Sequence, residues 1–375
     1  MKRTGAMLLV VLMGSFVADA QERPHRYVSY LPAKHPLITH GATPFIEHMA
    51  VGRNPVHYKL FPGGALLGAE NVLAGLQHNL AEIGQVVFIY YPAQFPYINI
   101  MAELAMVGSY APAVSAASTE FLWGACTPCK EEARRQGIVL LGLSSTSPYL
   151  HLSTEPINRW EDFRNLRVRS PGAVWDRWIE YTGGVPIFMS SGEAYEALTR
   201  GQVDVVLNPY SVLRTSSLWD AAKHVPTLPV GTYRPIGATV MSAAHWASLD
   251  DAQKLQAAWA STQASIGVSF GYMESDDLAS ARLEQEGVSL HEPDNEMRSR
   301  LSAFLDQERE WVIGSLRDRW QMHNIEVLVD AYIALNAKWH ARFVMLEGDQ
   351  ERMAQILWEE VVAPRIALEY GLSAD

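Results

Sequence analysis

The sequence predicts an α/β protein that is built around a parallel sheet and is large enough for two lobes. Strand and helix patterns alternate along residues 160–208, in the order strand, helix, strand, helix, strand, which is typical of a parallel α/β lobe. The last of these strands, 203–207, is a continuous apolar run, as expected for a strand that is buried on both faces. The rest of the chain is long enough for a second lobe with its own core.

Turn and capping residues delimit the elements of this stretch. Residues 166–170 alternate apolar and polar side chains as a half-buried strand does, and Pro171-Gly172 ends that strand. Ser190 followed by Glu193 matches a capping box at the start of a helix. We expect the other elements at 173–181 (helix), 185–189 (strand) and 193–200 (helix).

Arginine is concentrated beside the first of these strands, although the net charge of the chain is −11. Arg169 lies just before the Pro-Gly turn, at the carboxyl end of its strand, which is where ligands bind in open α/β sheets. A guanidinium there fits a carboxylate or a phosphate with two parallel hydrogen bonds. The alternation places Arg167 on the same face, so the pattern does not choose between the two. A solvated surface position is the alternative for each of them and for Arg159 and Arg164.

Residues 1–20 have the three parts of a secretory signal. Lys2 and Arg3 form the basic start, 6–17 the apolar core, and Ala18-Asp19-Ala20 the cleavage site. The apolar run is too short to span a bilayer, so we expect export to the periplasm without membrane insertion after cleavage. Cleavage removes two positive charges and one negative charge, which changes the net charge from −11 to −12. This charge argues against nucleic acid and anionic membranes as partners.

Cys126 and Cys129 are the two cysteines of the chain, in the order Cys-Thr-Pro-Cys. Such a pair at a helix start resembles a thioredoxin active site, where the motif lowers a thiol pKa. The small domain expected before such a motif is not found in the sequence. We therefore expect a local disulfide, as is typical of exported proteins, with a redox role as the alternative. Two sulfurs fall short of the four ligands of a structural zinc site.

The sequence offers no catalytic constellation. No nucleophile–base arrangement, phosphate-cradling loop or pair of carboxylates stands out, and the histidines lack metal-ligand spacing. We therefore expect no enzyme activity, no cofactor and no metal site.

The segment 162–171, DFRNLRVRSP, resembles a conserved segment of the solute-binding proteins of tripartite ATP-independent periplasmic (TRAP) transporters. The resemblance continues with its spacing intact over about fifty residues. It departs from the family pattern at Asn165, at Ser170 and at Val205-Val206. The further matching segments are Gly184-Val185-Pro186, 191–198 (SGEAYEAL), 200–204 (RGQVD) and Asn208-Pro209.

This resemblance implies a two-lobed periplasmic binding protein of the type II-like α/β class. Crossover strands such as 138–150 and a long bridging helix, 250–286, would join the lobes, and residues 295–370 would form a helical C-terminal region. The first lobe would comprise 21–147 and 236–275, and the second lobe 148–235 and 276–375. In the first lobe we expect helices at 43–53 and near 66–79 and strands at 56–61 and 85–90, with returning strands at 229–233 and 236–241.

The resemblance also implies roles for two residues: Arg169 would bind the ligand carboxylate and Asn208 would face the ligand. Tyr91 and Phe95 lie in a loop that borders the cleft in this family, although core packing is the common fate of such aromatics. Trp175 shares a helix face with Trp178 and lies nearer the strand end. Further candidates are Ser147 and Tyr149, in a hydroxyl-rich crossover where some relatives carry a second arginine.

We therefore expect a periplasmic protein that binds a carboxylate-bearing organic acid and delivers it to a TRAP-type membrane permease. Two alternatives remain: a periplasmic thiol-disulfide redox protein that uses Cys126 and Cys129, and an orphan binding protein that acts as a sensor or scavenger. The aromatic candidates are compatible with an aromatic or branched acid, and the hydroxyl-rich crossover is compatible with a hydroxy or keto acid, so the sequence does not name the ligand.

Overall fold

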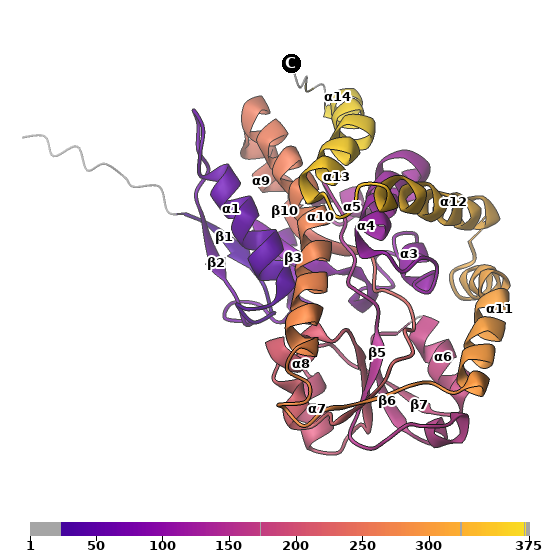
Figure 1. Cartoon of the computed structure of the whole chain (residues 1–375). Helices are drawn as coiled ribbons and strands as arrows, with labels where there is room; N and C mark the ends of the chain where they lie inside the picture. Colours follow the sequence, from indigo (N-terminus) through magenta and orange to yellow (C-terminus); the bar gives the residue numbers. More distant parts are fainter. Residues whose placement is uncertain (1–23, 173, 323–324, 371, 373–375) are drawn as a thin grey trace, which may run out of the picture.

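A computed structural model of the chain describes residues 24–172, 174–322, 325–370 and 372, and shows two mixed sheets surrounded by helices (Figure 1). The predicted two-lobed α/β architecture is confirmed, since each sheet is the centre of one lobe. The expected signal segment, 1–20, lies outside the described residues. Within those residues, we find no helix with the length and apolar character needed to cross a membrane.

The first sheet has the strand order β2-β1-β3-β10-β4. Its first three strands are parallel, because β1 pairs in parallel with both β2 and β3. The strand β10 comes from much later in the chain and pairs antiparallel with β3 and β4. The chain therefore leaves this lobe and returns to it. The strands are β1 (His25–Val28), β2 (Tyr58–Phe61), β3 (Ile83–Val87), β4 (Ile138–Val139) and β10 (Ile236–Ser242).

Helices cover both faces of the first sheet. The π-helix η1 leads directly into α1, and the helix α5 begins inside the Cys126–Cys129 segment. The helices of this lobe are η1 (Leu37–Ala42), α1 (Thr43–Met49), α2 (Val72–Gln77), α3 (Ile100–Glu103), α4 (Ala111–Glu120), α5 (Thr127–Arg135) and α9 (Ala243–Ser248).

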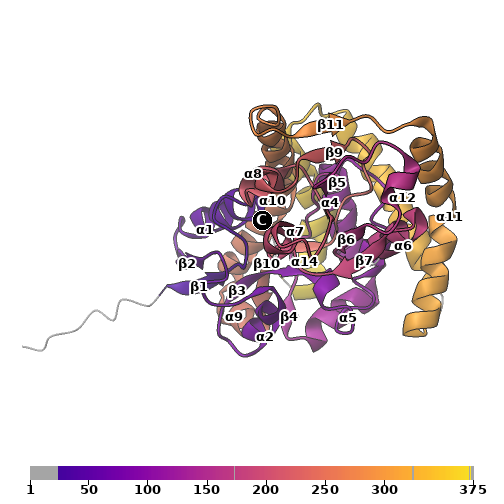
Figure 2. The ribbon, with the colours of Figure 1, turned by 90° about the horizontal axis from the view of Figure 1, so that it is seen from below.

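The second sheet has the strand order β11-β9-β5-β8-β6-β7, which Figure 2 shows from β11 at the top to β7 below. Its parallel part is the stretch predicted from the sequence, since β6 pairs in parallel with β7 and β8. The strand β5 pairs antiparallel with β8. The strands are β5 (Leu150–Ser153), β6 (Arg167–Ser170), β7 (Val185–Phe188), β8 (Val205–Asn208), β9 (His224–Pro226) and β11 (Ser289–His291), and the helices are α6 (Val174–Thr182), α7 (Ala194–Thr199) and α8 (Ser211–Thr215).

Two crossover segments, 140–149 and 229–236, run side by side between the sheets. They exchange backbone hydrogen bonds between Ser144 and Ile236 and between Tyr149 and Val230-Gly231. The expected continuous strand over 138–150 is wrong, because regular pairing is limited to β4 and β5 at its ends. The expected strand at 229–233 is wrong as well, since its backbone forms only the isolated bridge Pro148–Thr232 within the described residues. Each segment pairs with the other crossover rather than with a sheet.

The helix α10 (Asp251–Ser280) runs along both lobes (Figure 1). It begins at a capping box in which Asp250 accepts from the N–H of Gln253 and Gln253 reaches back to Asp250. It packs against η1, α1 and α4 of the first lobe and against α8 of the second. Small residues permit this close packing: a Cβ on Gly271 would lie 2.4 Å from His40 Nδ1. The predicted bridging helix is therefore present, although it ends at Ser280 rather than near 286.

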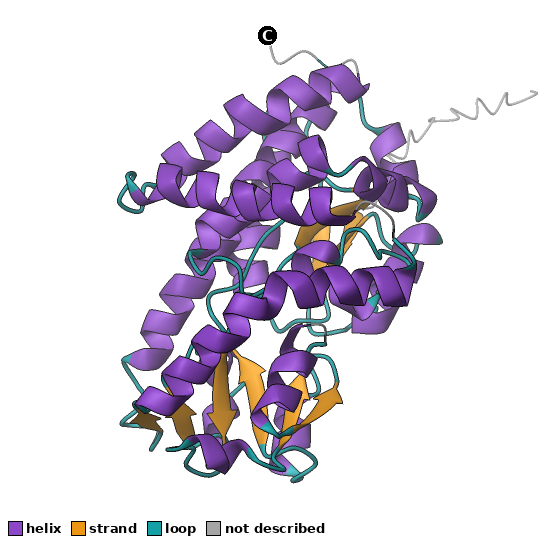
Figure 3. Cartoon of the chain, turned by 90° about the vertical axis from the view of Figure 1, so that its right-hand side faces the viewer, coloured by secondary structure: helices purple, strands orange, loops and turns teal. Residues whose placement is uncertain are grey.

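Four helices form the C-terminal region: α11 (Asn295–Trp320), α12 (Ile325–Val344), α13 (Gln350–Leu357) and α14 (Ala363–Tyr370). Figure 3 shows the long helix α11 along the side of the molecule, from the lower sheet to the upper lobe. Its Phe304 lies in the second-lobe core, whereas its Leu316 lies in the first-lobe core. The helix α12 packs against α4 of the first lobe. Residues 276–375 were expected in the second lobe, but the apolar faces of α12, α13 and α14 pack into the first-lobe core.

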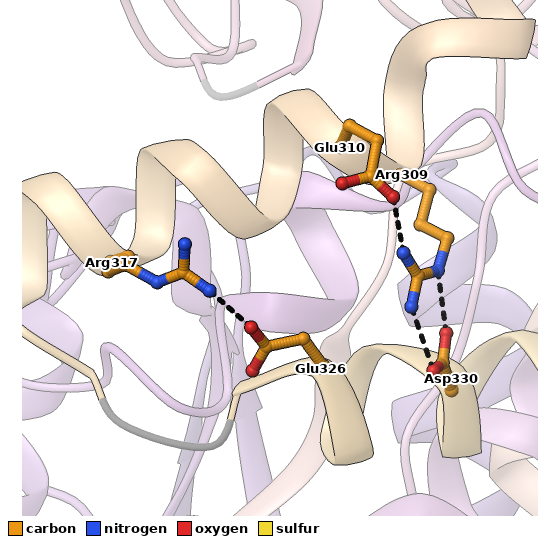
Figure 4. A network of polar contacts seen from close by, with 5 residues as sticks. All are labelled: Arg309, Glu310, Arg317, Glu326 and Asp330. Atoms are coloured by element: carbon orange, nitrogen blue, oxygen red, sulfur yellow. Dashed lines mark hydrogen bonds and ion pairs between the residues drawn. The ribbon is translucent and has the colours of Figure 1, made fainter.

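Charged side chains join α11 to α12 on the surface (Figure 4). Arg309 donates two hydrogen bonds to the carboxylate of Asp330, at 2.7 and 2.8 Å, and also contacts Glu310. Arg317 on α11 donates a hydrogen bond to Glu326 on α12. These pairs are exposed, so their main effect is on how the two helices are aligned.

Candidate functional site

The polar edge of the second sheet lies where β6 and β8 end and β5 begins. Register places Arg169 of β6 beside Val206 of β8, and places Leu150 of β5 opposite Asn208. The side chains of Arg169, Asn208 and Tyr149 therefore gather at one edge of the sheet. This is the carboxyl edge of the parallel strands, where α/β sheets bind ligands.

Arg169 is 1% exposed and is held by two backbone carbonyls of the same lobe. Its Nε donates to Met189 O at 3.1 Å and its Nη1 donates to Leu207 O at 2.9 Å. These bonds fix the plane of the guanidinium. Burial raises the pKa of Tyr149, and the charge of Arg169 beside its hydroxyl opposes that rise. Arg169 is thus a buried, oriented cation at the sheet edge.

The other arginines of this region are on the surface. Arg167 is exposed and pairs with Asp204, with Nη2 2.6 Å from Oδ1. Arg159 and Arg164 are exposed as well. The alternation in sequence could not separate Arg167 from Arg169, because the difference arises from position along the strand: Arg167 begins β6 and is exposed, whereas Arg169 lies one residue before its end and is buried.

A small cavity of about 30 Å³ lies between the two lobes. The first lobe contributes Tyr30, His35 and Tyr90, and the second contributes Asn208 and Ser191. The remaining lining residues come from the crossovers, the bridging helix and the adjacent core: Leu31, Leu37, Val87, Thr146, Tyr149, Val212, Tyr233, Ile236 and Tyr272. Among the described residues, the lining contains no Asp, Glu, Lys or Arg; the charge of Arg169 acts on the cavity from behind Tyr149.

Two of the predicted site residues line this cavity, Asn208 and Tyr149, and both are buried. Trp175 lies directly behind it: its ring stacks on Tyr149 with centroids 4.8 Å apart, and its Nε1 donates to Val230 O at 2.8 Å. Trp175 therefore fixes the orientation of the Tyr149 ring and ties it to the second crossover.

Ser147 does not line the cavity. Its hydroxyl donates to Asp276 Oδ2 on the bridging helix at 2.5 Å. The other carboxylate oxygen of Asp276 accepts from the backbone N–H of Ser211, at the start of α8, at 2.6 Å. Burial raises the pKa of Asp276 to about 7. Ser147 thus belongs to a polar junction between the crossover, the bridging helix and the second lobe.

Tyr91 and Phe95 lie in the first-lobe core, away from the cavity. Tyr91 donates to Ala69 O at 2.5 Å, and Phe95 packs edge-on against Phe88 with centroids 4.9 Å apart. The strand expected over 85–90 ends at Val87, and a 3-10 turn follows. This turn directs the neighbouring Tyr90 toward the cavity and Tyr91 into the core.

The sequence reasoning missed most of the first-lobe wall. Tyr90 could have been recognised from the sequence, because it ends an apolar run directly before Tyr91, which was predicted to be a site residue. Tyr272 could have been recognised as well, since it is a large side chain in the small-residue part of the bridging helix. His35 had no recognisable signal in its surroundings, Ala-Lys-His-Pro.

A second buried arginine, Arg234, lies on the other crossover and is committed to the first lobe. It donates to Leu104 O at 2.6 Å and to Gly108 O at 2.9 Å, and it contacts the hydroxyl of Thr232. Arg234 is absent from the cavity lining. Its role is to hold the return crossover against α3 and the loop that follows it.

Cys126 and Cys129 form a disulfide at the start of α5. Both cysteines are fully buried in the first-lobe core. Among the described residues, no group of three or more His, Cys, Asp or Glu side chains has the arrangement of a metal site.

The chain matches the family described as bacterial extracellular solute-binding protein, family 7, over residues 42–309. It is similar to a solute-binding protein of Albidiferax ferrireducens, with 20% identity over 181 residues, which is 48% of this chain and 52% of that protein. It is also similar to the sialic acid-binding periplasmic protein SiaP of Vibrio cholerae, with 29% identity over 105 residues, 27% of this chain and 32% of that protein. The chain spans about half or less of the length of these curated relatives.

Solved structures share the fold over most of the chain. A TRAP solute-binding protein of Rhodoferax ferrireducens, in complex with copurified benzoate, has a TM-score of 0.75 at 14% identity, covering 85% of this chain and 99% of that one. A marine metagenome protein in complex with metahydroxyphenylacetate has a TM-score of 0.75 at 19% identity, with the same coverage. An extracytoplasmic solute receptor of Bordetella pertussis that binds pyroglutamic acid has a TM-score of 0.68 at 18% identity, covering 83% and 99%.

Proposed function

The chain belongs to the bacterial extracellular solute-binding proteins of family 7, the solute-binding proteins of TRAP transporters, and we propose that it binds an organic acid between its lobes and delivers it to a TRAP-type permease. The proteins of this family are binding proteins rather than enzymes. Proteins with this fold are described with benzoate, metahydroxyphenylacetate and pyroglutamic acid. These ligands share a carboxylate, and we propose the same group for the ligand of this chain.

The observation that carries this proposal is the placement of Arg169. It is a buried guanidinium, oriented by Met189 O and Leu207 O, that lies behind Tyr149, and among the described residues the cavity lining itself has no Asp, Glu, Lys or Arg. A carboxylate in this cavity exchanges water for a fixed cation in a medium of low polarity, where the attraction is strong. Arg169 would hold the carboxylate, and Asn208 and the Tyr149 hydroxyl would complete its hydrogen bonding.

Binding requires the lobes to part and close again. A cavity of about 30 Å³ holds a single water molecule, whereas an organic acid has several non-hydrogen atoms. The two crossovers and the bridging helix are the connections about which the lobes would rotate. Closure is driven by the higher affinity of the ligand for the closed state. The closed form is the one that we propose the permease recognises, in the periplasm after removal of residues 1–20.

A thermal-shift screen tests this proposal. The protein spanning residues 21–375, unfolded and refolded to remove copurified ligand, is melted with a panel of monocarboxylates, amines and neutral sugars. An acid present at 100 times its Kd should stabilise the folded state by roughly 2.7 kcal/mol. The shift should vanish in Arg169→Ala and persist in Arg167→Ala, the matched surface variant. Stabilisation by sugars or amines but by no acid would contradict the proposal.

A further inference from the structure

We infer that His35 determines specificity in this cavity: its neutral imidazole donates a hydrogen bond to an uncharged acceptor on the end of the acid opposite the carboxylate. The inference rests on the proposed function and narrows the ligand to monocarboxylates that carry a hydroxyl or carbonyl oxygen at that end. His35 belongs to the first lobe, whereas Asn208 and the Arg169–Tyr149 pair belong to the second lobe.

The contacts of His35 fix its tautomer. The backbone N–H of Leu37 donates to His35 Nδ1 at 3.2 Å, so the proton of a neutral ring is on Nε2. Burial lowers the pKa of His35 to about 3, and the ring is 5% exposed. The imidazole therefore stays neutral at ordinary pH and presents an N–H donor.

This donor is poorly satisfied by the protein. Within the part of the chain that the structure describes, the polar partner of Nε2 is the hydroxyl of Tyr272, 3.5 Å away, at the limit of a hydrogen bond. The two rings stand edge-on, with centroids 5.5 Å apart at 90°, so both polar ends project from the same wall. Burial keeps the pKa of Tyr272 well above its usual value, so its hydroxyl retains its proton. An oxygen atom of a ligand would accept from both groups.

The charges around this wall exclude a second carboxylate. Among the described residues, the lining has no Lys or Arg; the cation beside it is the guanidinium of Arg169 behind Tyr149, and His35 remains neutral. The nearest acidic group is Asp276, one helical turn beyond Tyr272 on α10, and its charge acts on the Tyr272 hydroxyl. A second carboxylate at this end would lose its hydration without gaining a cation. A hydroxyl or carbonyl oxygen at the same place gains a donor.

Two series of acids test the inference, because within each series only the remote group changes. The aliphatic series is butanoate, 4-hydroxybutanoate and butanedioate; the aromatic series is benzoate, 3-hydroxybenzoate and benzene-1,3-dicarboxylate. Affinities are measured by calorimetry on the wild-type protein, on His35→Phe and on His35→Gln, whose amide retains a donor near the position of Nε2. In at least one series, the wild type should bind the hydroxy acid about tenfold more tightly than its parent acid, and the dicarboxylate more weakly than both.

His35→Phe should lose the preference for the hydroxy acid while it still binds the parent acid, and His35→Gln should retain the preference. Retained binding of the parent acid shows that the variant is folded, so the ratio of the two affinities is a readout that a merely structural role would not change. An unchanged ratio in His35→Phe, or a dicarboxylate that binds most tightly, overturns the inference and leaves the proposed function standing. Failure of every acid to bind the wild type overturns both.

Discussion

Asp276 lies at the junction of the two lobes, and folding raises the pKa of its carboxyl group. Its carboxyl group is buried between the crossover and α8, where it accepts from Ser147 Oγ and from the N–H of Ser211. These two bonds favour the carboxylate, but desolvation is the larger effect and raises the pKa to about 7. The folded protein therefore binds a proton here at pH values where the unfolded chain, with an ordinary Asp pKa, has released it.

Asp276 should make the protein less stable as the pH rises. Between about pH 4 and pH 7 the folded state holds a proton that the unfolded state lacks, so this group lowers the free energy of unfolding with increasing pH, to a limit above pH 7. In Asp276→Asn, Oδ1 still accepts from the N–H of Ser211, and Nδ2 donates to the Ser147 hydroxyl in the reverse direction, so the contacts are kept while the pH dependence is removed. We expect the variant to gain roughly 2 kcal/mol relative to wild type between pH 5 and pH 8.

Urea unfolding at the two pH values measures this gain, because the difference between variant and wild type cancels the titration of all other groups. Asp277→Asn is the matched control, since Asp277 is the exposed neighbour on the same helix. A difference that stays constant between pH 5 and pH 8 would show that Asp276 is already ionised in the folded protein.

At the scale of single residues, the sequence identified the second-lobe side of the cavity better than the first-lobe side. Arg169 and Asn208 lie at or next to the carboxyl ends of the adjacent parallel strands β6 and β8; strand prediction brings Arg169 to this edge, and the family resemblance adds Asn208. The sequence predicts Tyr91 as a cavity residue, but the structure places Tyr90 there. The direction of a side chain after a strand depends on the 3-10 turn that follows. His35 approaches the cavity through the packing of η1 against α10, which has no local signature in the sequence.

At the scale of elements, the disulfide closes the first turn of α5. Cys126 is also the N-cap of this helix, because its sulfur accepts from the N–H of Cys129 at 3.2 Å. The bond joins residues three apart, so it closes a short loop and contributes less than a long-range disulfide does. Its place in the first-lobe core separates it from the cavity.

Replacing both cysteines by alanine should lower the free energy of unfolding by roughly 2 kcal/mol and leave ligand affinity unchanged. Denaturant unfolding measures the first quantity and calorimetry the second. Wild-type protein treated with a reductant in mild denaturant serves as the matched control for the loss of the bond. If the double variant is folded and binds no acid, the Cys126–Cys129 pair has a functional role and the redox alternative regains support.

The positions of elements could be predicted from the sequence where local patterns determine them. The prediction failed where the pairing of distant segments determines the structure. The strands β6, β7 and β8 lie within two residues of their predicted bounds, because their alternation and turn residues are local features. Residues 229–233 have a similar apolar pattern but pair with the other crossover. No local feature of the sequence indicates this pairing. At Ser190, Glu193 bonds back to the N–H and hydroxyl as a capping box does, yet α7 begins only at Ala194.

At the scale of the whole molecule, the two lobes meet through a tyrosine. The N–H of Ser191 in the second lobe donates to the hydroxyl of Tyr90 in the first lobe at 3.1 Å. Phe188, which is 56% exposed, lies edge-on to the Tyr90 ring with centroids 6.2 Å apart. Both contacts join the first lobe to the second, so we expect them to break when the lobes part and to stabilise the closed state.

Tyr90→Phe should weaken ligand binding roughly fivefold, because it removes one hydrogen bond of about 1 kcal/mol from the closed state alone. The loss should appear mainly as faster dissociation, measured by stopped-flow tryptophan fluorescence. Small-angle scattering should still show contraction of the protein when the ligand is saturating. Tyr91→Phe is the matched control, since its hydroxyl bonds Ala69 within one lobe and its loss should affect stability rather than affinity. Equal affinity losses in the two variants would exclude a closing role for Tyr90.

The central claim is that Arg169 holds a carboxylate between the lobes. The most direct test compares an acid with the uncharged amide of the same acid. Calorimetry compares benzoate, or the best acid of the screen, with its neutral primary amide on wild type, Arg169→Lys and Arg167→Lys. The wild type and Arg167→Lys should prefer the acid strongly. Arg169→Lys should bind that acid roughly 30- to 100-fold more weakly, because an ammonium cannot reproduce the two-pronged contact. Equal affinities of acid and amide for the wild type, or unchanged acid affinity in Arg169→Lys, would contradict the account.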